Sequence, residues 1–529
     1  MKMKRPNILF ITTDQQRKDS IGCYGNHVVQ TPNIDRLAAE GTRFERAYCE
    51  SPICIPSRIT MITGKACANH RAPLHNTSMP DNERTIGQVL QENGYRTHFA
   101  GKPHFKSQQH RGTEESIADW RDGKFDGWHG PYCGFQTVDI ILGHSNSLVG
   151  HYGEWLRGKH PEAYVHFKES HLDCVSPDGG GTYRNTIPEA LHSSAYVAMR
   201  TNEFLDSMKG SESPFYCFAS FPDPHWPIMP PQPYFDMYRD APVPSQQPPV
   251  DAGKLDNYPR QFRIAHERHS TGYDGGGHYL NRPEDLPAIT RAYWGAVTFI
   301  DKNVGLILDK LDGLGMADNT IVVFTTDHGE YMGAHGMIAK GGFLWEEFIN
   351  TPLIIRSPNA SPRGFVSNAI FSFTDFVPTL LDMAGIDRHG LGCDGMIQTP
   401  VVNGGTREIR DNATIHHPKS FHGHDAALPD IRAIVTGRWK LIHYAGDPNG
   451  ELYDLQEDPG EEENLYHHPG HRQTRDELTI KLLDQIILQN NKEAINTSRT
   501  ADDYYGHHVM SCEMWKAEFV KLKRQTGRE

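Results

Sequence analysis

Two apolar runs that are widely separated in the chain each end in an aspartate. The run at residues 7–13 is followed by Asp14, and the run at residues 320–326 is followed by Asp327. Continuous apolar runs of this length, alternating with segments of helical periodicity, are typical of buried strands in a parallel sheet. Ligands bind beyond the carboxyl ends of such strands, so we expect the two aspartates to face one crevice.

The pattern of the whole chain predicts a large domain followed by a smaller one. Its 529 residues are enough for more than one domain. Residues 107–185 and 227–287 have poor periodicity and many Gly, Pro, His and aromatic residues, which predicts long surface excursions over the strand ends. The pattern changes after residue 405, and paired strands are predicted between residues 431 and 444. We therefore predict an α/β catalytic domain over residues 1–404 and an α+β subdomain with a tail over residues 405–529. Helices are predicted at residues 33–41, 288–314 and 475–488, with further strands at residues 215–220 and 451–455.

Composition argues against two classes of protein. The net charge of −13 and the scattered lysines and arginines provide no basic surface for nucleic acid, and no stretch is apolar enough to cross a bilayer. The basic residues 1–5 precede an apolar run of only residues 8–11, which predicts a buried strand rather than a signal peptide. We expect a cytoplasmic protein, or a periplasmic or secreted one if a leader has been removed. The nine irregularly spaced cysteines favour reduced thiols.

The most informative motif surrounds Cys54. Residues 51–58 have the sequence SPICIPSR, and a helical pattern continues from them to Thr63 and Gly64. Taken alone, a cysteine at a helix start is usually a small buried hydrophobe. A thiolate nucleophile is also open, because helix N-termini lower thiol pKa values. The motif alone does not choose between these roles.

The strand-end aspartates suggest ligands for a divalent cation. A hard cation needs several oxygen ligands in one pocket, and two carboxylates with an amide oxygen supply them. An isolated aspartate at a strand end is more often a turn or cap residue. The combination of Asp14, Asp327 and Cys54 in one chain favours a metal-assisted reaction.

The Cys54 motif resembles the signature of the type I, formylglycine-dependent sulfatases of the alkaline-phosphatase-like superfamily, which also includes the phosphonate monoester hydrolases. The resemblance continues from residues 31–38 to residues 451–460, and so covers nearly the whole chain. It implies an α/β fold with a large mixed sheet between helices and a smaller α+β C-terminal domain, in agreement with the pattern above. It also implies a maturation enzyme that oxidises Cys54 to formylglycine. The implied metal ligands are Asp14, Gln15, Cys54, Asp327 and His328.

The resemblance also assigns catalytic groups. Lys102 and His104 lie in a Gly-Lys-Pro-His segment similar to the family's Gly-Lys-Trp-His, and His225 and Lys340 follow later strands in the family's order. Among 30 histidines, one taken at random is more often a satisfied polar residue than a catalyst, and a single lysine is usually a solvated charge. The implied catalytic residues are Cys54, Arg58, Lys102, His104, His225 and Lys340, and the implied substrate-binding residues are Lys102, His225, Lys340 and Asn76.

Two positions depart from the commonest form of the family. Many sulfatases have an aspartate where this chain has Gln15 and an asparagine where it has His328. The forms found here look more like the phosphonate monoester hydrolases and some carbohydrate sulfatases, so phosphonate monoesters and phosphate diesters stay open as substrates. The resemblance favours Ca²⁺ as the metal, whereas a nitrogen ligand keeps Mn²⁺ as the alternative.

The resulting hypothesis is metal-assisted hydrolysis of a sulfate monoester. Attack builds negative charge on the sulfuryl and leaving oxygens, so the site must be cationic. Arg58 would hold the hydrated aldehyde, while Lys102 and Lys340 would bind the sulfuryl oxygens. His225 would protonate the leaving oxygen, a task that it would share with Lys340. His104 would remove the proton from the second hydroxyl of the hydrate, which expels sulfate.

A saccharide sulfate is the expected substrate. The aromatic segments at residues 128–132 and 225–227 could stack on sugar rings, although packing of a loop explains them equally well. The alternative class is a non-catalytic binding protein on the same fold. A small-molecule sulfate and a homo-oligomeric assembly both stay open.

Overall fold

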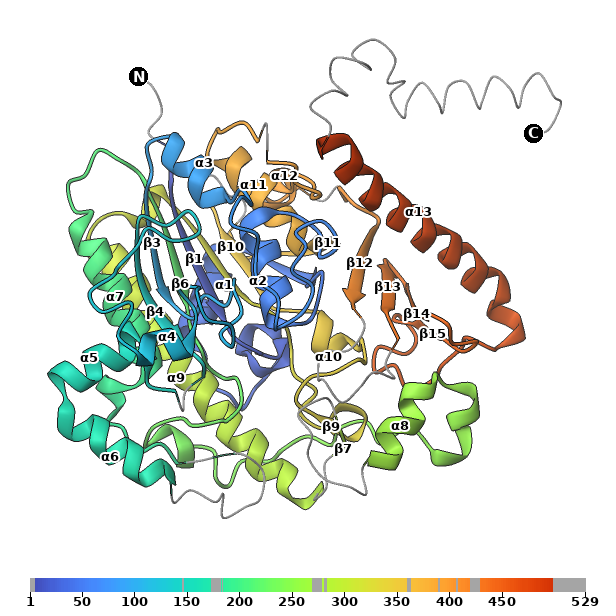
Figure 1. Cartoon of the computed structure of the whole chain (residues 1–529). Coiled ribbons are helices and arrows are strands. Elements are labelled where there is room, and N and C mark those ends of the chain that lie inside the picture. The colour runs from blue at the N-terminus through green and yellow to red at the C-terminus, as the bar shows by residue number, and fades with distance from the viewer. Residues whose placement is uncertain are drawn as a thin grey trace, which may run out of the picture.

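The computed structural model describes residues 5–144, 147–172, 182, 184–268, 278–279, 283–358, 363–388, 391–405, 408–418 and 429–497. A nine-stranded mixed sheet lies at its centre, with strand order β11-β2-β10-β8-β1-β6-β3-β4-β5 (Figure 1). Its strands are β1 (Asn7–Thr13), β2 (Thr42–Tyr48), β3 (Arg96–Gly101), β4 (Thr137–Leu142), β5 (Val149–Gly150), β6 (Phe215–Ser220), β8 (Thr320–Thr326), β10 (Leu353–Arg356) and β11 (Phe365–Ser372).

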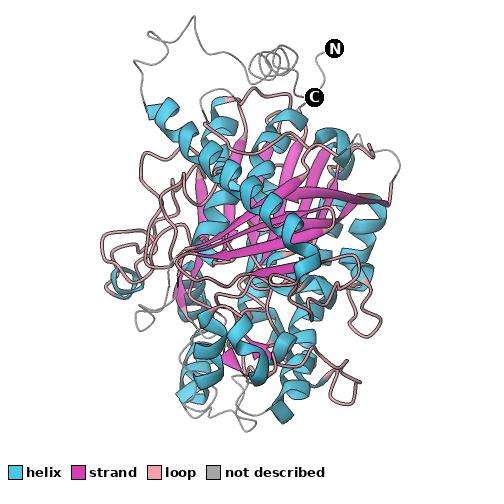
Figure 2. Ribbon diagram, turned by 90° about the vertical axis from the view of Figure 1, so that its right-hand side faces the viewer, coloured by secondary structure: helices cyan, strands magenta, loops and turns pink. Residues whose placement is uncertain are grey.

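Helices cover both faces of this sheet (Figure 2). They are α1 (Pro32–Glu40), α2 (Cys54–Thr63), α3 (Ile86–Glu92), α4 (Ile117–Arg121), α5 (His151–Lys159), α6 (Pro161–Leu172), α7 (Ser193–Ser207), α8 (Arg260–Arg268), α9 (Leu286–Gly313), α10 (Glu346–Ile349), α11 (Phe376–Met383) and α12 (Thr399–Val402). The central strand β1 is therefore buried on both faces. Ile8 and Phe10 join a cluster with α2, α3 and α11, whereas Leu9 and Ile11 join a cluster with α1, α7 and α9. Because successive side chains point to opposite faces, burial on both faces explains the continuous apolar run.

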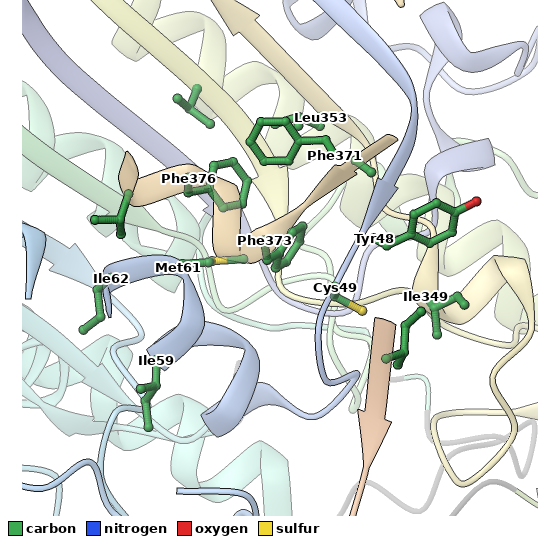
Figure 3. Packing of buried hydrophobic residues seen from close by; sticks show 14 of the residues in the cluster. Tyr48, Cys49, Ile59, Met61, Ile62, Ile349, Leu353, Phe371, Phe373 and Phe376 are labelled. Carbon is green, nitrogen blue, oxygen red and sulfur yellow. The ribbon is translucent and has the colours of Figure 1, made fainter. Parts of the chain in front are cut away.

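Helix α2 is anchored by apolar packing. Its side chains Ile59, Met61 and Ile62 lie in the same buried cluster as Phe373 and Phe376 (Figure 3). Burying each such side chain contributes about 1.5–3 kcal/mol. Every residue of α2 is buried, so the first residue of this helix has a fixed position relative to the sheet.

A second, antiparallel sheet follows in the chain. It comprises β12 (Asn412–His417), β13 (Ile431–Thr436), β14 (Trp439–Tyr444) and β15 (Glu451–Asp454), and the long helix α13 (Arg472–Thr497) lies beside it (Figure 1). Leu478 and Leu482 of α13 pack against Ile434 and Leu441. A short two-stranded sheet joins β7 (His278–Tyr279) to β9 (Met337–Ile338). The predicted fold class, a large mixed sheet between helices with a smaller C-terminal α+β unit, is confirmed.

The prediction of long surface excursions over residues 107–185 was wrong in one respect. That segment contains β4, an interior strand of the main sheet, together with β5 and three helices. The β4 run is short and lies among polar and glycine-rich segments, and its partner β3 is distant in the chain, so local periodicity did not reveal it. Helix α13 also extends beyond the predicted residues 475–488, and the tail from residue 498 lies outside the described residues.

The boundary after residue 404 stays a prediction. Within the described part of the chain, all seven cysteines are free thiols, as their spacing predicted. No helix among the described residues combines the length and the apolar character needed to cross a bilayer.

Candidate active site

Five neighbouring strands deliver polar side chains to one edge of the main sheet. In sheet order, β8, β1, β6, β3 and β4 are parallel, so their carboxyl ends lie at the same edge. The residues that follow these ends are Asp327 and His328, Asp14 and Gln15, His225, Lys102 and His104, and His144. This edge is where parallel sheets bind ligands. The structure thus places Asp14 and Asp327 in one crevice, as their sequence positions predict.

Cys54 faces this crevice as the first residue of α2. Its buried Sγ lies 3.0 Å from Nζ of Lys340, 3.3 Å from Nε2 of His328 and 3.8 Å from Oδ1 of Asp14. Burial raises the pKa of the thiol to about 11, and the Asp14 carboxylate adds to the increase. At neutral pH the unmodified group is therefore a thiol, which is a weak nucleophile. The raised pKa of the unmodified thiol argues against the thiolate mechanism.

Arg58 lies one turn further along α2 and compensates two buried carboxylates. Its Nε donates to Oδ2 of Asp327 at 2.8 Å, and its Nη2 lies 3.3 Å from Oδ2 of Asp14. Its Nη1 donates to the Lys102 carbonyl and to Oγ of Ser220, both at 2.8 Å. These partners follow or end four different strands, so one guanidinium ties the ends of β1, β8, β3 and β6 together.

Four buried residues could share a metal ion. One ligand atom from each of Asp14, Cys54, Asp327 and His328 lies within 4.8 Å of the others. Burial alone raises the pKa of Asp14, but the charge of Lys102 and other nearby cations outweighs burial and lowers this pKa well below its usual range. The carboxylate form required of a ligand is therefore favoured.

Gln15 adds an amide oxygen to this group. Its Nε2 donates to the carboxylate of Glu330, which fixes the orientation of the amide. Its Oε1 is buried and has no hydrogen-bond partner among the described residues. The backbone of Gln15 is left-handed, with φ 62°, and is held by a hydrogen bond of 3.0 Å from its N–H to Asp327 Oδ1. A left-handed non-glycine residue costs on the order of 1–3 kcal/mol, and such residues cluster at functional sites.

A chain of cations and imidazoles forms the positive side of the crevice. Nζ of Lys102 lies 3.1 Å from Nδ1 of His144, and the His144 ring stacks on His225 with centroids 3.6 Å apart. Nζ of Lys340 lies 2.9 Å from Nε2 of His225, whose Nδ1 lies 2.5 Å from the Trp226 carbonyl. The carbonyl can only accept, so Nδ1 carries the proton and Nε2 accepts from Lys340.

The protonation of this pair follows from burial and charge. Burial lowers the pKa of Lys340, but the hydrogen bond to the Cys54 sulfur and the charge of Asp14 outweigh that effect and raise it. Burial, together with the stacked His144 and with Lys340, lowers the pKa of His225 well below its usual range. The pair is therefore an ammonium next to a neutral imidazole.

Gly101 makes the close approach of two strand ends possible. A Cβ at this position would lie 1.8 Å from the carbonyl oxygen of Ser220, and the backbone has φ +113°. Only glycine satisfies both conditions. The next residue, Lys102, donates its N–H to the same carbonyl at 3.0 Å, and this places its side chain in the crevice.

His104 and His75 also lie close to the sulfur of Cys54. Their rings are 5.4 Å apart, and one nitrogen from each lies within 4.8 Å of the other and of the Cys54 sulfur. Burial lowers the pKa of each imidazole, and nearby lysines lower both further. Both rings are therefore neutral at pH 7 and able to accept a proton.

Ten of the predicted site residues lie around this crevice, and the exception is Asn76. The side chain of Asn76 is exposed, and its neighbour His75 lies against the crevice instead. The sequence analysis missed His75 and His144. His144 follows the apolar run of β4 and Gly143, a signal that recognition of that strand would have supplied. His75 lies in an irregular segment without such a signal.

Comparison with known proteins decides the family. The Sulfatase family model matches residues 6–386, and the model for the C-terminal part of N-sulphoglucosamine sulphohydrolase matches residues 333–488. The chain belongs to the sulfatase family. It is 30% identical over 488 residues to the uncharacterized sulfatase YidJ of Escherichia coli, with 92% of this chain and 88% of that protein covered. It is 29% identical over 505 residues to the N-acetylglucosamine-6-O-sulfatase of Bacteroides thetaiotaomicron, with 92% and 87% covered.

A solved structure gives the same fold. The phosphonate monoester hydrolase of Agrobacterium radiobacter is 26% identical to this sulfatase, with a TM-score of 0.72 and with 92% of this chain and 96% of that chain covered. The predicted family, the alkaline-phosphatase-like fold and the enzyme class are confirmed. This sulfatase is a sulfuric ester hydrolase, and the crevice at the strand ends is its candidate active site.

Proposed function

We propose that this sulfatase hydrolyses sulfate monoesters of a carbohydrate, using a formylglycine made from Cys54 and one divalent cation. The surroundings of Cys54 carry the proposal: a buried sulfur at a helix start, in contact with an ammonium group and within reach of carboxylate and imidazole ligands. A structural cysteine needs no such partners. The similarity to an N-acetylglucosamine-6-O-sulfatase supports a sugar substrate.

Asp14, Gln15, Asp327 and His328 would hold the cation together with residue 54. The buried amide oxygen of Gln15, which has no partner among the described residues, supports this assignment because such an atom is costly unless it has a ligand role. We propose Ca²⁺, with Mn²⁺ as the alternative because one donor is a ring nitrogen. When bound, the cation supplies positive charge that stabilises the developing charge on the sulfuryl oxygens.

Formylglycine at position 54 would supply a hydrated aldehyde, with one hydroxyl for attack on sulfur. Removal of the proton from the second hydroxyl would reform the aldehyde as the C–O bond to sulfate breaks. Nη2 of Arg58 is the nitrogen of that side chain without a hydrogen bond to any described residue, so it would hold this hydrate. The ammonium groups of Lys102 and Lys340 would bind the sulfuryl oxygens. The neutral imidazole of His104, beside residue 54, would accept the proton that frees sulfate.

We assign protonation of the leaving oxygen to the Lys340–His225 pair. His225 is a neutral imidazole without a proton on Nε2, because this nitrogen accepts from Lys340. The proton would therefore come from Lys340, either directly or through Nε2 of His225. The sequence analysis suggested that His225 and Lys340 share this role, and we now assign the proton itself to Lys340.

Phosphonate monoesters are the second candidate substrates. The similarity to a phosphonate monoester hydrolase and the presence of Gln15 and His328 favour this alternative. A sulfate monoester and a phosphonate monoester with the same leaving group separate the two candidates. We expect the larger kcat/KM for the sulfate, and a larger value for the phosphonate would replace the proposed substrate class.

The nucleophile is tested by mass spectrometry after co-expression with a formylglycine-generating enzyme. Cleavage after Arg46 and Arg58 releases a peptide that contains both Cys49 and Cys54, so Cys49 is an internal control. We expect the mass change of thiol-to-aldehyde conversion at position 54 only, and loss of turnover in Cys54→Ala. An unmodified Cys54 thiol in fully active enzyme would rule the mechanism out.

A further inference from the structure

We propose that a second pocket beside the active site binds an anionic sugar unit of an oligosaccharide substrate, an inference that rests on the proposed carbohydrate specificity. The pocket has a volume of about 670 Å³ and lies among α4, β5, α5 and α6. Small-molecule sites typically span about 300–1,000 Å³, so its size fits a sugar unit. The resemblance to sulfatases assigned no residue of this pocket.

The position of the pocket connects it to the reaction. Ser147 lines the pocket, and its N–H donates to the carbonyl of His144 at 2.7 Å. His144 in turn stacks on His225 in the active site. The strands on either side of this turn are paired, with Leu142 opposite Val149. His144, before the turn of this hairpin, therefore belongs to the active site, and residues 147–150, after the turn, belong to the pocket wall. The proposed saccharide would extend from one to the other.

The charged side chains that line the pocket favour binding of an anion. Arg121, Arg157 and Lys168 come from three different helices and line the same cavity. Arg157 interacts electrostatically with Glu154, which also lines the pocket. Guanidinium groups match the paired oxygens of a carboxylate or a sulfate, with donors in a fixed fork. The pocket is therefore cationic within a protein whose net charge is −13.

The acidic residue of the pocket weakens this charge very little. Glu154 is the one carboxyl group among the described residues that line it. Burial, together with the hydrogen bond and the charge of Asp126, raises the pKa of Glu154 to about 7. Near neutral pH the group is thus partly protonated, and it can exchange hydrogen bonds with sugar hydroxyls while the cations dominate.

The remaining walls suit a sugar ring better than a simple inorganic anion. Trp120 and Phe167 are buried residues of the lining. Tyr164 is partly exposed, and the Lys168 Nζ lies 4.7 Å from the centre of its ring. The indole Nε1 of Trp120 donates to the Glu114 carbonyl at 2.7 Å, which fixes that ring. A uronate or sulfated sugar combines an apolar C–H face with an anionic group, and both find a partner here.

The experiment compares substrates of two lengths. Arg121→Ala, Arg157→Ala and the double variant are assayed on a monosaccharide sulfate and on a tetrasaccharide that carries the same sulfated end and further carboxylate or sulfate groups. Lys159→Ala is the matched control, because Lys159 is an exposed cation on α5 outside the pocket lining. We expect KM for the tetrasaccharide to rise roughly three- to tenfold per arginine, with the monosaccharide and the control unchanged. Equal effects on both substrates, or an equal effect of the control, would overturn the proposal.

A binding measurement keeps this test separate from the proposed reaction. If the wild-type enzyme cleaves no saccharide sulfate, the carbohydrate activity fails on that result alone. Calorimetry with the desulfated, uronate-containing tetrasaccharide then examines the pocket directly. Binding to the wild type that is lost in the double arginine variant supports the pocket, and absence of binding to the wild type refutes it.

Discussion

Replacing Arg58 with methionine is expected to cost about 3–5 kcal/mol of folding free energy in the metal-free protein. The guanidinium is 1% exposed and lies between two carboxylates that are 0% exposed. Removing one partner of a buried ion pair costs about this much, because the remaining charge is left without compensation. Asp14 keeps the ammonium of Lys102 as a partner, so the loss falls mainly on Asp327.

Urea unfolding at pH 7 measures this loss, and Arg36→Met is the control. Arg36 pairs with Asp309 at 2.8 Å, but the two side chains are 37% and 64% exposed, and exposed pairs contribute about 0.2–1 kcal/mol. The part of the Arg58 contribution that comes from Asp14 should persist as the pH falls and be lost only below pH 3.8. The reason is that the pKa of Asp14 is lowered from 3.8 in the folded state, so its contribution disappears only as the pH falls through that lowered value. Equal losses in the two variants at pH 7 would refute the reasoning.

Four further predictions concern the active site. In His104→Ala we expect a burst of one turnover and a sulfated enzyme detectable by mass spectrometry, and steady turnover at the normal rate would contradict the role of His104. Gln15→Leu removes the free amide oxygen, so we expect the metal affinity measured by calorimetry to fall about tenfold, as ligand-shell changes commonly do. His144→Ala removes a partner of Lys102 and a ring stacked on His225, and should raise KM for a sulfate ester roughly three- to tenfold. Because the pKa of His104 is lowered from 6.5, the acid limb of the kcat profile should lie below pH 6.5, and an inflection at or above 6.5 would exclude a neutral His104 as the base.

Local sequence was sufficient for the elements that are buried on both faces. The strands at residues 7–13, 215–220 and 320–326 have the predicted bounds, because continuous apolar runs leave few alternatives. The two strand-end aspartates were predicted to meet from the same apolar runs, whereas the other site residues were implied by the resemblance of the Cys54 motif and later segments to the sulfatases. A strand end in a parallel sheet has a fixed relation to the ligand crevice.

Other features depended on contacts between distant segments. β4 could be recognised only beside β3, and its recognition is what places His144 in the site. The neutral state of His225 results from burial and from a lysine that lies 115 residues away in the chain.

The amino-acid sequence by itself was sufficient to predict an α/β fold that resembles the sulfatases, with Cys54 at the start of a helix and aspartates at two strand ends. Only the tertiary structure decided which histidines face Cys54, which nitrogen of His225 carries the proton, and which charged side chains line the same pocket. Sequence patterns report which residues are buried, because burial selects residue type. Pairing, protonation and cavity shape depend instead on the distances between segments that only the folded chain brings together.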